Sequence, residues 1–185
     1  MRFLVLILSI LATPAWTENI CDELWLTRNQ VFEQAGYCFG STLGKAVFGT
    51  AGCTTKSPTV SGAAEVLIDQ VKQLEAQNGC KVDTTRQTLD IPLLNQRLAL
   101  SDLPLVDPFE SACIGWRGGE LPLFPVRSAE GIPFGSIRRG DTIRSAHQSA
   151  EAWDFVIIQR AGQDVVLGWT PGIAYDADSC DALAG

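Results

Sequence analysis

Apolar and polar residues follow two different periods along this chain of 185 residues, and the two periods divide it. In the first part, apolar residues recur every three or four positions, which is typical of a helix buried on one side. Residues 22–35 and 61–78 show this pattern, and they end at Gly36 and Gly79. Glycine readily adopts the left-handed conformation that ends a helix. Residues 93–100 follow a proline and predict a third, shorter helix.

The later part of the chain, residues 124–170, has a shorter period. Its β-branched and aromatic residues come in short runs separated by Gly, Pro and Asp, which predicts several short strands. In the run 153–158, odd-numbered residues would face one side of a strand and even-numbered residues the other. Gly140 and Gly162 lie in predicted tight turns. Closely spaced strands of this kind are typical of a small barrel or sandwich.

The first fifteen residues have the features of a secretory signal peptide. Arg2 is followed by an apolar run over residues 3–11, which is too short to span a bilayer, and then by small residues up to Ala15. No second long apolar segment follows. We therefore expect cleavage after Ala15, no membrane span after signal removal, and a secreted protein in the periplasm or outside the cell.

All six cysteines lie after the predicted signal peptide: Cys21, Cys38, Cys53, Cys80, Cys113 and Cys180. An even number of cysteines in a secreted chain indicates disulfides. The sequence does not choose among the many possible pairings, and we expect the sequential one, Cys21–Cys38, Cys53–Cys80 and Cys113–Cys180. Zinc is a weaker reading, because the chain has no Cys-x-x-Cys spacing and His147 is its only histidine.

Four short motifs occur in order in the strand-rich part. They are Val126-Arg127-Ser128, then Ile137 with Gly140-Asp141 and Ile143, then Trp153 with Val156, and finally Gly168-Trp169-Thr170. This order resembles the bacterial SH3-like domain. The resemblance implies a small β-barrel that binds rather than catalyses, often beside the cell wall. An unrelated small β-domain with the same turn chemistry is the alternative.

A second set of motifs lies in the first predicted helix and just after it. Leu24-Trp25, Arg28-Asn29, Gly36-Tyr37 and Phe39 resemble the YARHG module, a small extracellular bacterial domain of unknown biochemical role. Residues 32–36 read FEQAG where that family has Tyr-Ala-Arg-His-Gly. The Arg–His pair is absent, so the resemblance implies a scaffold and transfers no site.

The first helix carries polar residues on its apolar face. Arg28 and Asn29 share that face with Trp25, and buried polar groups must find hydrogen-bond partners. We expect those partners to be backbone carbonyls of the loop 40–52. Trp25, Arg28, Asn29 and Gly36 would then form a structural hub, on which helix 61–78 packs.

These features together predict an α+β protein. A signal peptide would occupy residues 1–15, a disulfide-linked helical YARHG-like module residues 16–105, and an SH3-like β-barrel domain with a short C-terminal tail residues 106–185. Residues 107–119 would be a linker into the barrel, with Trp116 packing on it. The tail beyond Cys180 would be loose.

The net charge and the absence of known catalytic motifs argue against several functional classes for this protein. The chain has 14 basic and 21 acidic residues and a formal net charge of −7, which becomes −8 when Arg2 leaves with the signal peptide. This balance disfavours nucleic acid as a partner. The chain has no phosphate-binding loop, no nucleophile elbow and no cofactor motif. His147 falls in a polar gap that predicts an exposed loop, and Asp107 with Glu110 is a weak candidate for a glycosidase pair.

A binding surface is the better prediction. Basic and aromatic residues gather in the SH3-like part, and arginine can hold carboxylates through two hydrogen bonds. The candidate ligand-binding residues are Arg127, Arg138, Arg139, Trp153 and Trp169. We expect a secreted, non-catalytic envelope protein without a cofactor that binds peptidoglycan or an envelope protein. The alternative is a small periplasmic hydrolase, or an inhibitor or regulator of an envelope enzyme.

Overall fold

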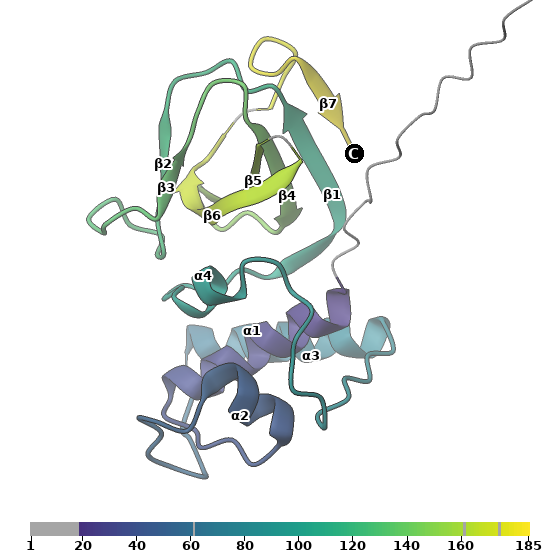
Figure 1. The fold of residues 1–185 in the computed structure, drawn as a ribbon, viewed down its shortest axis with the longest axis vertical. Helices are drawn as coiled ribbons and strands as arrows, with labels where there is room; N and C mark the ends of the chain where they lie inside the picture. Colours follow the sequence, from purple (N-terminus) through teal and green to yellow (C-terminus); the bar gives the residue numbers. More distant parts are fainter. Residues whose placement is uncertain (1–18, 61, 161, 174) are drawn as a thin grey trace, which may run out of the picture.

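The computed structural model describes residues 19–60, 62–160, 162–173 and 175–185, so the predicted signal peptide lies outside the described residues. Helices and strands occupy opposite ends of the molecule (Figure 1). Three helices come first in the chain, a short fourth helix leads to the other end, and all the strands follow it. This confirms the predicted mixture of N-terminal helices and a C-terminal sheet.

Four helices form the first end: α1 (Ile20–Gln34), α2 (Thr42–Phe48), α3 (Ala63–Gln77) and α4 (Leu94–Leu98). The side chain of Asn19 accepts a hydrogen bond from the backbone N–H of Cys21 and caps α1. Ser41 caps α2 in the same way, with the N–H of Gly44 as donor. The three predicted helices are confirmed, whereas α2 lies where the sequence predicted a loop.

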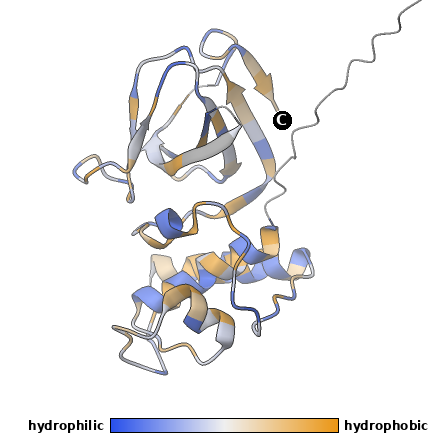
Figure 2. Ribbon diagram, viewed as in Figure 1, coloured by the Kyte–Doolittle hydropathy of each residue, from blue (hydrophilic) through white to orange (hydrophobic). Residues whose placement is uncertain are grey.

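The helical core combines α1 and α2 with the segment that follows α3. Trp25, Leu26 and Leu43 are buried together with Leu89 and Ile91. In Figure 2 the helices carry apolar and polar residues in alternation, as expected for helices with one buried side. The helical end is therefore completed by residues well beyond α3.

The predicted partners of the two polar residues on α1 are wrong. Arg28 binds Glu75 of α3 rather than carbonyls of the loop 40–52. Asn29 donates to the carbonyl of Trp25, one turn earlier on the same helix, at 2.7 Å. The reason is that α3 packs along α1, as predicted, and brings a carboxylate within reach of Arg28.

The strands form one antiparallel five-stranded sheet and a separate hairpin. The sheet has the order β6-β5-β4-β1-β7 and the hairpin pairs β2 with β3. A single bridge between Phe124 and Trp169 connects the end of the hairpin to β6. The sheet is not closed into a barrel. The strands are β1 (Val106–Ile114), β2 (Leu121–Leu123), β3 (Gly135–Ile137), β4 (Thr142–His147), β5 (Trp153–Arg160), β6 (Gln163–Pro171) and β7 (Ala182–Ala184).

Both faces of β5 are covered, in the alternation that the sequence predicts. Phe155 and Ile157 pack against Leu100 at the helical side. Val156 and Ile158 pack in a second cluster on the opposite side of the sheet. This second cluster also buries Trp116, which packs on the strands as expected. The central strand thus joins two apolar cores.

Three predictions about the ends of the sheet are wrong. Residues 107–119 are not a linker, because β1 occupies their first half and pairs with β4. Val126-Arg127-Ser128 is not a strand, because β2 ends at Leu123. The tail is not loose, because β7 pairs with β1. For β1 and β7, pairing with a strand distant in sequence decided the outcome.

The three disulfides are Cys21–Cys80, Cys38–Cys53 and Cys113–Cys180. Only the last agrees with the predicted sequential pairing. A helix of 15 residues is about 22 Å long, so Cys21 at the start of α1 cannot reach Cys38 beyond its end. Cys80, three residues beyond the end of α3, lies beside the start of α1 instead.

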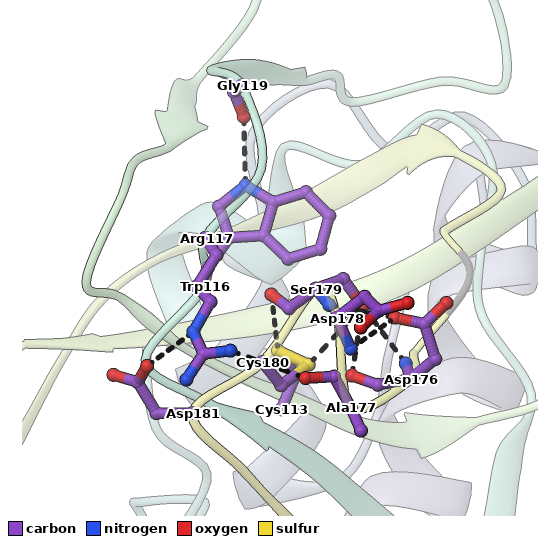
Figure 3. Close-up of a disulfide and its surroundings, with 10 residues drawn as sticks. All are labelled: Cys113, Trp116, Arg117, Gly119, Asp176, Ala177, Asp178, Ser179, Cys180 and Asp181. Atoms are coloured by element: carbon purple, nitrogen blue, oxygen red, sulfur yellow. Dashed lines mark hydrogen bonds and ion pairs between the residues drawn. A yellow bond between two sulfur atoms is a disulfide. The ribbon is translucent and has the colours of Figure 1, made fainter.

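The third disulfide holds the C-terminal tail on the sheet (Figure 3). Around it, Arg117 donates to the carboxylate of Asp181 at 2.7 Å and to the carbonyl of Ala177 at 3.3 Å. Asp176 caps the turn by accepting from the N–H of Ser179 at 2.7 Å. These bonds place β7 at the edge of β1. Among the described residues, no helix has the length and apolar composition to cross a membrane.

Candidate ligand-binding groove

A groove of about 610 Å3 lies where the helical end meets the strands. One wall consists of residues of α1 and α3, including Gln34, Leu67 and Gln70. The other wall consists of the segment 101–105, the loop between β4 and β5, and two residues of the sheet end, Arg127 and Trp169. The groove therefore exists only because the two ends pack together.

The side chains that line the groove are mostly apolar or neutral and polar. The neutral hydrogen-bonding side chains are Gln34, Gln70, Ser101, Gln148 and Ser149. Its two charged side chains, Asp102 and Arg127, lie 3.3 Å apart and form an ion pair. Such a lining suits a ligand that carries amides and few charges.

Arg127 is held in place by two residues, Asp102 and Trp169. Its backbone N–H and its Nε both donate to Asp102, at 2.8 and 3.3 Å. Its guanidinium lies over the indole of Trp169, with 5.4 Å between Cζ and the ring centroid. Its terminal nitrogens donate to none of the described residues. The guanidinium is thus held through its Nε and its face, and both terminal nitrogens remain available to a ligand.

Trp169 contacts both Asp102 and Arg127. Its side chain is buried, its Nε1 donates to the carbonyl of Asp102 at 2.9 Å, and its ring meets the edge of Phe155. It therefore orients Asp102 and Arg127 and does not offer an open aromatic face. Trp153 is half-buried and packs against Phe124, with ring centroids 6.1 Å apart.

The structure brings together two of the residues that the sequence suggested for ligand binding, Arg127 and Trp169. Arg138 and Arg139 lie elsewhere, at the turn between β3 and β4. Both are exposed, and Arg138 lies 3.5 Å from Glu120. No sequence pattern indicated the helical wall, because Gln34 and Gln70 stand at ordinary polar positions of their helices.

A buried ionic cluster lies between α1, α4 and β4. Nε2 of His147 and Oε1 of Glu23 are 2.7 Å apart, and Arg97 donates to the same carboxylate oxygen. The side chains of His147, Glu23 and Arg97 are 1%, 2% and 3% exposed. The predicted exposed loop at His147 is wrong, because β4 extends to this residue and its ring packs on Phe155.

Burial lowers the pKa of His147, because the charged imidazolium loses its hydration. Glu23 acts in the opposite direction, whereas Arg97 and Arg144 lower the pKa further. We therefore assign the neutral imidazole, with the proton on Nε2 so that it donates to Glu23. Nδ1 then has no partner among the described residues. The histidine is a buried contact between the two ends of the molecule.

The suggested glycosidase pair is engaged in local structure. The carboxylate of Asp107 accepts from the backbone N–H of Phe109 at 2.9 Å. Glu110 binds Arg144 at 2.5 Å. No group of three or more His, Cys, Asp or Glu side chains among the described residues could hold a metal ion.

Each end of the chain matches a known sequence family. The YARHG domain matches residues 4–76, and a domain of unknown function, DUF4453, matches residues 79–185. The second match covers more than half of the chain. The chain belongs to the DUF4453 family. The strands are thus matched by DUF4453 rather than by an SH3-like family, and no curated protein and no solved structure shows a significant match.

The border between the two matches does not coincide with the change from helices to strands. The DUF4453 match begins at residue 79, whereas the strands begin at Val106. Its first residues pack into the helical core, and the Cys21–Cys80 disulfide links them to the YARHG match. The groove accordingly takes residues from both matched regions.

Proposed function

We propose that this protein is a non-catalytic binding protein of the bacterial envelope, and that the groove between the helices and the strands holds its ligand. The ligand would come from the cell wall or from an envelope protein. The observation that carries this proposal is Arg127, a guanidinium fixed over Trp169 at the groove wall with its terminal donors directed to no described residue.

The covalent structure supports the proposed compartment. All six cysteines form disulfides, which persist in oxidising surroundings outside the cytoplasm. The YARHG match supports the same location. A place in the periplasm or outside the cell is therefore part of the proposal.

An SH3-like organisation of the strands also belongs to this proposal. The bridge between Phe124 and Trp169 brings the β2–β3 hairpin against the free edge of β6. The hairpin and the sheet would then act as an incomplete barrel. Trp169, at the closing contact, also supports Arg127, which would connect the barrel-like end to ligand binding.

The lining of the groove favours a peptide that carries a carboxylate. Arginine binds a carboxylate through two parallel hydrogen bonds. The amides of Gln70 and Gln148 can pair with peptide groups, which have the same donors and acceptors, whereas Nε2 of Gln34 already donates to the carbonyl of Leu100 at 3.0 Å. Cell-wall stem peptides and protein segments share this chemistry. Asp102 is the one acidic side chain of the described lining and is engaged by Arg127, which supports binding rather than hydrolysis.

Co-sedimentation with purified cell-wall sacculi tests the proposal. We expect the oxidised mature protein to pellet at low and at high salt, and Arg127→Ala to weaken binding by about tenfold or more, since it removes a charged hydrogen-bonding group. The Arg138→Ala/Arg139→Ala double variant is the matched control, because it removes two exposed arginines away from the groove.

The control separates the possible results. Pelleting that only Arg127→Ala weakens supports a wall ligand in the groove. Equal weakening by the control would indicate a general surface-charge effect and reject the groove. Absence of pelleting at either salt would reject a wall ligand and leave a protein ligand, to be sought by cross-linking from a cysteine placed at Gln70.

A further inference from the structure

The buried Glu23–His147–Arg97 cluster connects the three elements that continue into the groove. From Glu23, α1 runs on to Gln34 in one wall. From Arg97, the chain leaves α4 and forms the segment 101–105 of the other wall. From His147, the chain enters the β4–β5 loop, residues 148–150, also in that wall. A change at the cluster would therefore reach both walls.

The two ends of the molecule are joined by non-covalent contacts at this place. Two disulfides lie within the helical end and its following segment, and the third lies within the strands, so none of the three crosses the groove. Next to the cluster, the buried side-chain amide of Gln30 on α1 donates to the carbonyl of Arg97, in the chain that enters the other wall, at 2.9 Å. Each end also has an apolar core of its own. The junction can open without breaking a covalent bond.

Cations already lie near His147, so a positive charge on its imidazole would be unfavourable in the closed form. Glu23 faces it from α1 and Arg97 from α4, and these two already form an ion pair. Arg144 of β4 also lies close enough to act on it, and its partner is Glu110 of β1. The ring of Phe155 on β5 covers the remaining side. One carboxylate would thus face two or more cations if the imidazole were protonated.

We propose that the Glu23–His147–Arg97 cluster is an acid-sensitive lock that holds the two walls of the groove together, so that the groove is closed on its ligand near neutral pH and releases it in mild acid. The release of ligand rests on the proposed function. The opening of the junction is a property of this chain alone and is testable without a ligand.

The size of the effect follows from proton linkage. In the closed form burial depresses the pKa of His147, whereas in the open form the imidazole is hydrated and has the ordinary pKa of about 6.5. Protons therefore bind preferentially to the open form, and the opening equilibrium constant rises as the pH falls below that value. From pH 7.0 to pH 5.0 this rise can reach about 25-fold, the limit for a closed form that takes up no proton. Exposed carboxylates are still ionised over most of this range, so the histidine dominates it.

Amide hydrogen exchange measures the opening directly. We expect the protection factor of the Gln30 side-chain amide, which donates from α1 to the carbonyl of Arg97, to fall by up to about 25-fold between pH 7.0 and pH 5.0 in the wild-type protein. In His147→Gln the side-chain amide can still donate to Glu23 but takes up no proton, so this fall should shrink to about twofold or less. An equal fall in His147→Gln, or no fall in the wild type, would overturn the lock.

Two further observations make the test independent of that variant. The protection factor of the Gln30 side-chain amide must stay below those of the β5–β6 ladder amides at each pH, because equal protection would mean global unfolding and no local opening. The chain has a single histidine, so its imidazole proton resonance needs no assignment by mutation. A resonance that titrates near pH 6.5 in the fully closed protein would show an exposed imidazole and overturn the proposal.

Sacculus binding at the same two pH values separates this inference from the proposed function. Binding at pH 7.0 that weakens at pH 5.0 in the wild type but not in His147→Gln supports both. Binding that is equal at both pH values, despite faster exchange of the Gln30 side-chain amide, would overturn the release of ligand. If sacculi fail to bind at either pH, the wall ligand is rejected, and the exchange and resonance measurements still decide whether the lock exists.

Discussion

Arg28 of α1 and Glu75 of α3 bind each other through three hydrogen bonds of 3.0 to 3.1 Å. Their side chains are 25% and 18% exposed, so water screens the contact only in part. The two helices that they join also form the helical wall of the groove. The contact therefore fixes the spacing within that wall as well as the packing of the helical end.

Glu75→Gln should destabilise the protein by about 1 kcal/mol, because a neutral amide replaces the ionised acceptor of a two-pronged arginine contact. Equilibrium unfolding in urea would measure this change. Asp69→Asn is the matched control on the same helix, since the ion pair of Asp69 with Lys72 is 3.5 Å long and both side chains are more than half exposed. An equal loss in Asp69→Asn would contradict a specific role of the Arg28–Glu75 contact.

A second ion pair makes the strands sensitive to strong acid. The carboxylate of Asp141 accepts from Nε of Arg160 at 2.6 Å, from its terminal nitrogen at 2.7 Å and from the N–H of Arg138 at 2.7 Å. Burial by itself would raise the pKa of Asp141, but these donors outweigh it and hold the pKa below the ordinary value of 3.8. The ionised form is therefore favoured in the folded state.

Because the folded pKa of Asp141 is lower than the unfolded one, its contribution to stability is complete above about pH 3.8 and is lost as the pH falls through the folded value. We expect Asp141→Asn to cost about 2 kcal/mol at pH 7, as for a lost hydrogen-bonded charge, and progressively less as the pH falls to 2. Urea unfolding of both proteins across this range is the measurement. A difference that does not change with pH would exclude ionisation of Asp141 as its cause.

The helices could be predicted from sequence because each carries its own signal. Helix α3 has a regular apolar spacing and a glycine at its end, and both are local features. Strand β1 has no such signal, because Asp107, Pro108 and Glu110 interrupt its apolar residues and most of its side chains are exposed. Its place in the sheet comes from pairing with β4 and β7, which lie far away in the chain.

The same difference between local signals and long-range contacts applies to the residues of the candidate site. Arg127 and Trp169 could be selected because a basic and an aromatic residue stood in a recognisable motif. The buried cluster could not, because Glu23 reads as a favourable charge in the first turn of a helix and His147 as a loop residue. Their contact joins positions 124 residues apart and exists only after the two ends pack.

Gly36 supplies a backbone conformation that other residues adopt with difficulty. Its φ of +80° lies in the left-handed region, and a Cβ there would meet Oγ1 of Thr54 at 2.4 Å. We expect Gly36→Ala to destabilise the protein by about 1 to 2 kcal/mol. Gly40→Ala is the control, because no atom lies within 4 Å of the added Cβ and its φ is not positive. Thermal unfolding of the two variants would reveal the difference, and equal melting temperatures would refute the conformational requirement.

The pairing of the first four cysteines is directly testable by peptide mapping. Trypsin cleaves after Arg28, Lys45, Lys56, Lys72 and Lys81, so these four cysteines fall on four different peptides. Without reduction, we expect the peptide of Cys21 to be linked to that of Cys80, and the peptide of Cys38 to that of Cys53. Links of Cys21 to Cys38 and of Cys53 to Cys80 would instead support the sequential pairing.

Removal of each of these two disulfides should lower the free energy of unfolding by a different amount. The Cys21–Cys80 bond closes a separation of 59 residues and the Cys38–Cys53 bond one of 15. In the chain-entropy view the longer loop contributes about 4 kcal/mol and the shorter about 3 kcal/mol. Paired Cys→Ser replacements, compared by urea unfolding, should therefore lose more stability at Cys21 and Cys80. The reverse order would mean that the local fold around Cys38 and Cys53, rather than loop length, decides their contribution.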